Sequence, residues 1–346
     1  MWRRLTLLGV LLGLLAVLVL PLQAKPPKPP SAPPSGPGLI AFNDGVGVAV
    51  MNPDGTARTR VATLFNAGSV LPVWSHMFSD GTVKLFWRES NLSPLMVVNV
   101  FPQIGVPTAV LDVDVPALGD FNLAPSVIRE DGTETVRICY HKTIPNPDGP
   151  ARGDIKIIQL VYDPQSGAFT VDPDTAPLFI EAASGVHYWN AEFSPEGTWI
   201  AFQRDELGDS AIWVVKSDGT APPVLVADAP GFGDGGPTWS PDGTRLAFAS
   251  NRDARQNQVG DIYIAALNPD MSVQSIERKT NSTRIVEGFL SWSPADANGE
   301  QICYGSVAVW GYWPMGKVML STGQQYDLGY GAFPTWSRMD LPKLPW

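Results

Sequence analysis

The sequence has few of the residues on which catalytic and metal sites are usually built. It contains two cysteines and three histidines among 346 residues, and only 17% of its residues are charged. Two cysteines exclude a disulfide-rich scaffold and a cysteine-rich zinc site. The formal net charge of -10 disfavours a surface that follows the phosphates of nucleic acid. We therefore expect no nucleic-acid partner.

The motifs of common enzyme classes are also missing. The sequence has no G-x-S-x-G, no H-E-x-x-H and no C-x-x-C. Residues 311–317 have the glycine and lysine spacing of a phosphate loop, but Val318 stands where a serine or threonine would hold magnesium. The sequence therefore indicates no catalytic residue.

Glycine, proline and tryptophan are plentiful by contrast. There are 33 glycines, 33 prolines and 12 tryptophans, and 44% of the residues are hydrophobic, enough for a sizeable core. This composition is typical of many short strands joined by tight turns, and it disfavours long helices.

The first 38 residues differ from the rest of the chain. Arg3 and Arg4 precede an apolar stretch that ends near Leu20, and Ala24 offers a small residue for cleavage. This pattern predicts export to the periplasm or the exterior without a membrane span, and an uncleaved membrane anchor is the alternative. A proline-rich stretch follows, which we expect to run extended. The predicted divisions are a signal peptide (1–24), a proline-rich linker (25–38) and one folded domain (39–346).

One motif recurs along the folded domain. Its clearest copy begins at Pro237 and reads PTWSPDGTRLAF. The apolar run that ends in Trp-Ser is a first strand, Pro-Asp-Gly suits a tight turn, and the alternating run is a second strand. A third strand such as DIYIAAL and a fourth strand follow. Four antiparallel strands repeated at such intervals indicate the blades of a β-propeller. The serine of the motif marks six copies: Ser75, Ser126, Ser194, Ser240, Ser293 and Ser337.

The two ends of the folded domain complement each other. Residues 39–51 begin with a second strand that no first strand precedes, whereas residues 333–337 are a first strand that no second strand follows. Pairing the two ends would complete one blade and cover its exposed edges. The predicted fold is therefore all-β, a six-bladed β-propeller of four-stranded antiparallel blades, closed by the N- and C-terminal strands.

These repeats resemble those of the TolB-like six-bladed propeller family. The Trp-Ser-Pro-Asp-Gly turn, the SNRD segment from Ser250 to Asp253 and the DIYIAAL strand carry the resemblance, which covers about residues 39–338. It implies an envelope or extracellular protein whose propeller holds a partner. The chain departs from TolB in having the proline-rich linker where TolB has an α/β domain, so the resemblance does not imply a Tol-Pal role.

The recurring residues of the motif are expected to have structural roles. We expect the motif tryptophans to pack between blades and the turn aspartates to cap local backbone groups. Cys139 and Cys303 are predicted on opposite blades, too far apart for a disulfide, so both should be buried free thiols. The residues concerned are Trp74, Trp239, Trp292 and Trp336, and Asp54, Asp80, Asp131, Asp218 and Asp242.

The variable loops supply the candidate binding surface. In a propeller, the loops between second and third strands and between successive blades emerge on one face. Aromatic and arginine side chains gather in these loops, a composition typical of contact surfaces. The alternative is that the rings fold back over the blade edges as local core. The predicted binding residues are Trp310, Tyr312, Trp313, Arg252, Arg204, His187 and Trp189.

No cofactor or metal is predicted from these patterns. The three histidines, His76, His141 and His187, fall on different blades, so a histidine metal cluster is not expected. Two aspartate pairs, at residues 112 and 114 and at residues 172 and 174, resemble weak calcium ligands but lack the glycine and glutamate spacing of a dedicated loop. Solvated loop acids are the preferred interpretation.

The function that these features favour is binding. We expect a monomeric, exported, non-catalytic propeller that acts as a binding or scaffold module for a protein or an envelope polymer. The alternative is a propeller enzyme, such as a lactonase, a lyase or a glycan-acting hydrolase, with its site at the central channel. An enzyme would need at least two acidic or histidine groups that converge on one substrate there.

Overall fold

The folded part of the chain consists of β-strands and the turns between them. The computed structural model describes residues 36–64, 70–89, 93–110, 121–172, 179–253, 260–281, 289–296, 299–305 and 314–345. The regular structure in these ranges is all β-strand. No helix in them is long and apolar enough to span a membrane. The predicted signal peptide lies outside the described residues.

Four of the sheets have four antiparallel strands each, in the order that the repeats predict. The chain ends share the first sheet: β26 (Ala332–Trp336), β1 (Ile40–Asn43), β2 (Gly47–Met51) and β3 (Thr59–Thr63). The second is β4 (Val73–Trp74), β5 (Val83–Trp87), β6 (Leu95–Phe101) and β7 (Thr108–Val110). The others are β18 (Asp234–Trp239), β19 (Arg245–Ser250), β20 (Asp261–Leu267) and β21 (Val273–Arg278), and β22 (Leu290–Trp292), β23 (Gln301–Gly305), β24 (Pro314–Met319) and β25 (Gln324–Tyr330).

The fifth sheet has ten strands and consists of two groups. One group is β8 (Phe121–Leu123), β9 (Val127–Ile128), β10 (Glu134–Ile144), β11 (Arg152–Asp163), β12 (Ala168–Val171) and β13 (Phe179–Ile180). The other is β14 (Val186–Phe193), β15 (Trp199–Glu206), β16 (Asp209–Lys216) and β17 (Val224–Ala227). A single parallel bridge, Gly153 opposite His187, joins them. The two groups are therefore separate four-stranded and six-stranded units that share one backbone bridge and pack against each other through side chains.

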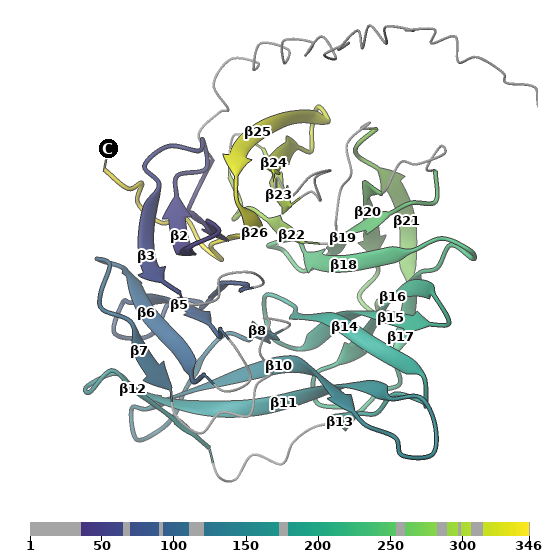
Figure 1. Ribbon diagram of the computed structural model, residues 1–346, viewed down its shortest axis with the longest axis horizontal. Helices are drawn as coiled ribbons and strands as arrows, with labels where there is room; N and C mark the ends of the chain where they lie inside the picture. Colours follow the sequence, from purple (N-terminus) through teal and green to yellow (C-terminus); the bar gives the residue numbers. More distant parts are fainter. Residues whose placement is uncertain are drawn as a thin grey trace, which may run out of the picture.

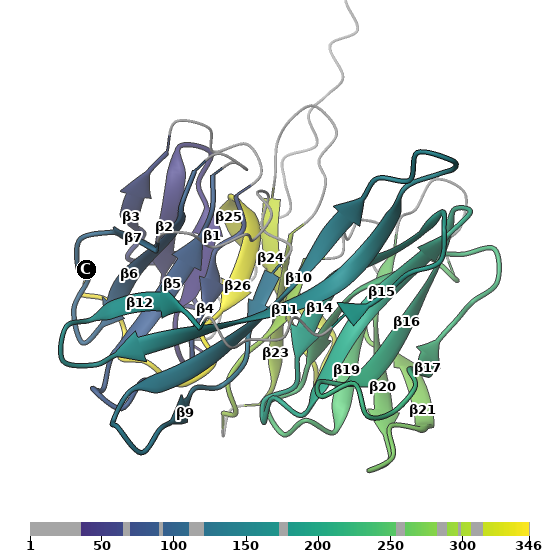
Figure 2. The same ribbon diagram turned by 90° about the horizontal axis from the view of Figure 1, so that it is seen from below.

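The strand groups are arranged around a common centre (Figure 1). The innermost strands are β4, β8, β14, β18, β22 and β26, and each contacts the next, with β26 returning to β4. Figure 2 shows the long β10–β11 hairpin from the side, with β12 at the end of the hairpin that lies near β6 and β7. The innermost strands therefore form a ring.

Hydrophobic side chains fill the contact surface between each pair of neighbouring groups, which we call a seam. The buried hydrophobic residues of the described chain form six clusters, each of which draws on two neighbouring groups. The predicted packing of the motif tryptophans is confirmed, since all four are buried. Cys139 and Cys303 are both buried thiols outside any disulfide, as predicted. The sixth cluster packs Cys303 and Met315 against Phe42 and Trp336, so it joins the last group to the first.

The serine of the motif closes the turn between the first two strands. Ser240 Oγ accepts a hydrogen bond from the Arg245 backbone N–H at 3.0 Å. Asp242 Oδ1 accepts one from the Thr244 N–H at 3.0 Å, and Gly243 takes a φ of +69°, which favours glycine. The predicted capping role is confirmed for the other turn aspartates, since each accepts the N–H two residues on: Asp54, Asp80, Asp131 and Asp218.

The two ends of the folded domain are joined by strand pairing and by the same kind of serine hydrogen bond. β1 pairs antiparallel with β26, with Ile40 opposite Trp336. Ser337 Oγ accepts from the Leu39 N–H at 3.0 Å, as four other motif serines accept from a backbone N–H at the start of a second strand: Ser75, Ser194, Ser240 and Ser293. Trp336 Nε1 donates to the Pro37 carbonyl at 2.7 Å. The last residues of the predicted linker, 36–38, are therefore buried against the folded domain.

Candidate functional site

A cavity of about 100 Å³ lies at the centre of the ring. All six innermost strands supply lining residues, and Arg338, which follows the end of β26, also lines the cavity. One residue from each strand shows how the wall is built: Val73, Asn122, Asn190, Pro237, Ser291 and Thr335.

Two opposite charges meet in this cavity. Arg338 Nη1 donates to Glu192 Oε1 at 3.0 Å, and the two side chains are 19% and 14% exposed. The same carboxylate oxygen accepts from Thr238 Oγ1 at 3.2 Å and from the Trp239 N–H at 3.3 Å. The pair is thus largely shielded and fixed by neighbouring strands. It leaves the cavity with polar donors and acceptors and no net charge from these two residues.

His76 lies beside this pair. Burial, with the Arg338 charge acting in the same direction, lowers the pKa of His76 to about 3. The imidazole is therefore neutral near pH 7. It adds a hydrogen-bonding group to the surroundings of Arg338 without adding a charge.

The rest of the cavity wall combines aromatic rings and amides. Phe289 and Phe333 pack edge to face with ring centroids 4.4 Å apart, and Phe121 also lines the cavity. Asn122 Oδ1 accepts from the Phe193 N–H at 3.2 Å, and Asn190 Nδ2 donates to Gln203 at 3.0 Å. Such a wall suits apolar and hydrogen-bonding contacts. Among its described residues, the only carboxylate is that of Glu192, and Arg338 neutralises it.

The residues predicted for the loop face have varied surroundings. Trp310, Tyr312 and Trp313 lie outside the described residues. Arg252 Nη2 donates to the buried Asp234 at 2.7 Å, and its guanidinium lies over Tyr263 with 5.0 Å to the ring centroid.

Arg204 lies in strand β15 rather than in a loop. Its Nη2 is 2.6 Å from Glu206 Oε2, and its guanidinium lies 6.0 Å from the Trp213 ring. Arg204 and Arg252 are thus both engaged within their own strand groups.

His187 and Trp189 are brought together with a histidine that the prediction left out. His141, on β10, lies with its ring centroid 3.8 Å from Trp189 and 6.1 Å from His187. His187 and Trp189 stack at 5.5 Å with an interplanar angle of 11°. Burial, reinforced by His187 and opposed by Asp154, lowers the pKa of His141 to about 4. The three rings sit at the single bridge between β11 and β14, and we call this contact the histidine seam.

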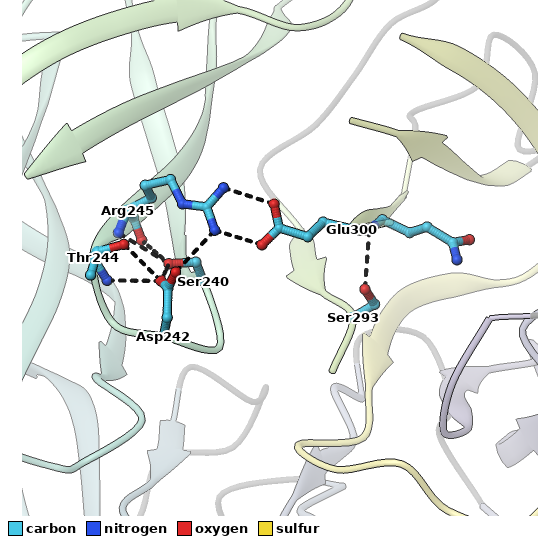
Figure 3. Close-up of polar contacts among 7 residues, drawn as sticks. Ser240, Asp242, Thr244, Arg245, Ser293 and Glu300 are labelled. Atoms are coloured by element: carbon cyan, nitrogen blue, oxygen red, sulfur yellow. Dashed lines mark hydrogen bonds and ion pairs between the residues drawn. The ribbon is translucent and has the colours of Figure 1, made fainter. Parts of the chain in front are cut away.

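A second polar cluster lies between β19 and β23, and we call this contact the ion-pair seam (Figure 3). Arg245 forms a bidentate pair with Glu300, with N–O distances of 2.7 and 2.5 Å. Asp242 also accepts from Arg245 at 3.2 Å. The neighbouring cleft, about 370 Å³, holds Lys279 paired with Glu277 at 2.7 Å. All charged groups that line this cleft are therefore paired, which favours a structural role.

The aspartates considered as weak calcium ligands, for which solvated loop acids were the preferred interpretation, are in part described. Asp172 forms an ion pair with Arg129 and accepts from Gln159 Nε2 at 2.8 Å. The other three aspartates, at residues 112, 114 and 174, lie outside the described residues. In the part of the chain that the structure describes, no three His, Cys, Asp or Glu side chains are grouped to hold a metal ion.

Comparison with known proteins identifies the fold. No protein-family model matches the chain, and no curated protein matches it. Among solved structures, a protein of Agrobacterium tumefaciens described as a TolB is 16% identical, with a TM-score of 0.52, over 86% of this chain and 91% of that one. TolB from Acinetobacter baumannii is 13% identical, with a TM-score of 0.52, over 89% of this chain and 68% of that one. The chain has a TolB-like propeller fold.

A further neighbour comes from a nidogen/laminin complex. It is 11% identical, with a TM-score of 0.53, over 88% of this chain and 99% of that one. At such identities the likeness extends to the fold alone. The resemblance inferred from the repeats is therefore confirmed at the level of the fold.

Proposed function

We propose that this chain is an exported six-bladed β-propeller that binds a segment of another protein at its central cavity. Six blades are supported by the closed ring of innermost strands and by the six hydrophobic clusters between neighbouring groups. The pairing of β1 with β26 supports closure by the chain ends. Export is supported by the signal-like pattern of residues 1–24.

The observation that carries the binding function is the Glu192–Arg338 pair beside aromatic rings. A hydrolase or lyase would need a carboxylate or histidine free to exchange a proton with its substrate. Here the carboxylate is held by Arg338, Thr238 and the Trp239 backbone. Fixed polar groups next to apolar rings instead suit a contact surface, in which a few buried anchors dominate affinity.

Protein is the partner that these features favour. An apolar side chain of the partner would pack against Phe289 and Phe333, and its backbone would hydrogen-bond near Arg338. The nidogen neighbour, solved in a nidogen/laminin complex, is consistent with a propeller that contacts another protein. The loop that carries Trp310, Tyr312 and Trp313 stays a predicted extension of this surface.

Site-specific photo-crosslinking in the native organism tests this proposal. A photoreactive residue replaces Phe289 at the cavity or, as control, Ile276, which is 38% exposed on the outer strand β21. We expect one defined protein adduct from position 289 and none from position 276. Adducts of equal yield from both positions, or none from position 289, would contradict the proposal.

A charge variant then tests the pair itself. Arg338→Met leaves Glu192 without its cationic partner, so adduct yield from position 289 should fall at least about tenfold, the size expected for a contact hot spot. The matched control is Arg60→Met, because Arg60 pairs with Asp44 at 2.7 Å on the exposed rim. Equal yields from the two variants would show that the partner does not use Arg338.

A further inference from the structure

Two imidazole nitrogens at the histidine seam have no hydrogen-bond partner. His141 Nε2 and His187 Nδ1 are both buried atoms, and neither is bonded to any group in the described chain. His141 as a whole is only 6% exposed. An unmade hydrogen bond at a buried polar atom costs about 1–3 kcal/mol. Two such atoms side by side therefore call for a ligand that satisfies both.

The two nitrogens converge on one place beside the Gly153 backbone. A Cβ atom built on Gly153 would lie 2.6 Å from His141 Nε2 and 2.7 Å from His187 Nδ1. Gly153 is also the residue that pairs with His187 in the bridge between β11 and β14. The absence of a side chain at residue 153 is thus what allows both imidazoles to approach this place.

The surroundings hold the two rings, and the described residues group no third His, Cys, Asp or Glu side chain with them. Trp189 stacks against the His187 imidazole and contacts the His141 imidazole at a tilt of 32°. The buried carboxylate of Asp154, whose charge acts on His141, already accepts from Arg152 Nε and from the Ala182 N–H, each at 3.0 Å. His187 and Trp189 are only half-buried, so the histidine seam lies close to the protein surface.

We propose that the histidine seam binds one divalent transition-metal ion of the zinc, nickel and copper class, with His141 Nε2 and His187 Nδ1 as its protein ligands. Neutral imidazole nitrogen is a preferred donor for these ions, at about 2.0–2.1 Å for zinc. The ion would lie between the nitrogens on the side away from the Gly153 backbone. Water completes its coordination, so the ion ties β10 to β14 and keeps positions open for a further donor.

Zinc titration of the full chain, free of any polyhistidine tag and stripped with chelator, tests this site. Calorimetry should report one Zn²⁺ per chain. His141→Gln and His187→Gln should each weaken binding by at least about tenfold, the range known for impaired metal sites. The matched control is His76→Gln, which removes the third histidine and should leave the dissociation constant unchanged. No binding at millimolar Zn²⁺, or equal weakening in all three variants, overturns the proposal.

A second measurement needs no variant and so does not depend on how the variants fold. The chain has three histidines, which allows each imidazole to be followed in a long-range ¹H–¹⁵N spectrum of the unaltered protein. Zn²⁺ should shift Nε2 of His141 and Nδ1 of His187 and leave His76 in place. Unmoved His141 and His187 signals at saturating Zn²⁺ would exclude the site even if zinc bound elsewhere. Failure of this test leaves the proposed cavity function untouched, because the two sites share no residue.

Discussion

The ion-pair seam and the histidine seam both place polar side chains between neighbouring strand groups, but they differ in whether those side chains have partners. At the ion-pair seam, Arg245 meets Glu300 in a bidentate pair, and both side chains are about one-third exposed. At the histidine seam, His141 and His187 present buried nitrogens to each other without a partner. A polar seam whose charged groups are all paired is accounted for by a structural role alone. One with two orphaned atoms points to something else that binds there.

The largest predicted effect comes from filling the space between the two histidines. Gly153→Ala would place a methyl group against both nitrogens, so the free energy of unfolding should fall by about 1–3 kcal/mol, as for other overpacked interiors. Gly233→Ala is the matched control, because a Cβ there meets no atom within 4 Å. We expect its effect to stay within about 0.5 kcal/mol in urea unfolding. Equal losses in the two variants would mean that Gly153 does not hold the histidine seam open.

Substitutions at the ion-pair seam should change the free energy of unfolding less. In a double-mutant cycle with Arg245→Met and Glu300→Gln, we expect a coupling free energy of about 0.5–1 kcal/mol, since both side chains are partly exposed. Salt should reduce this coupling, because exposed charges are screened. A coupling that is several times larger and insensitive to salt would show that the pair behaves as a buried one, and the contrast between the seams would be lost.

The repeat motif explains why the sequence predicts the ion-pair region well. Ser240 and Asp242 act through bonds to residues two to five positions away, so a short segment contains everything that its turn needs. Trp239 packs where the same position packs in other copies. Local chemistry that repeats is visible in a sequence, and here it is sufficient to place whole sheets.

The histidine seam was not predicted because it depends on strand lengths. β10 and β11 have 11 and 12 residues, more than any other strand in the described ranges. β10 carries His141 beyond the usual end of a second strand, and β11 begins early enough to include Gly153 ahead of the usual start of a third strand. Only the register then places Gly153 opposite His187. The 68 residues between Ser126 and Ser194, the widest spacing of the motif, were the one available sign of this insertion.

The sequence contained a clearer indication of the Glu192–Arg338 pair, which the prediction did not use. Proline follows the motif serine at Ser194, Ser240 and Ser293, whereas Arg338 follows Ser337 and His76 follows Ser75. Val127 after Ser126 is a third exception. Of the three, Arg338 lines the central cavity and His76 lies beside it, where a turn proline would supply neither charge nor hydrogen bond. Glu192, the partner of Arg338, belongs to a distant copy of the motif, and only the arrangement of the innermost strands brings the two together.

The dependence of stability on pH also separates the two seams. Burial alone would raise the pKa of Asp242, but hydrogen bonds from Ser240 and Thr244 and the charge of Arg245 outweigh it and lower the pKa to about 2. A carboxyl group whose folded pKa lies below its unfolded value, about 3.9, contributes stability that is present above that value and is lost as pH falls through the folded pKa. The stability difference between the unaltered chain and Asp242→Asn should therefore be constant near pH 6 and shrink between about pH 4 and pH 2. Urea unfolding at matched pH values measures this difference. If it stayed constant down to pH 2, the turn bonds would not favour the ionised carboxylate, and the ion-pair seam would not be the fully paired counterpart of the histidine seam.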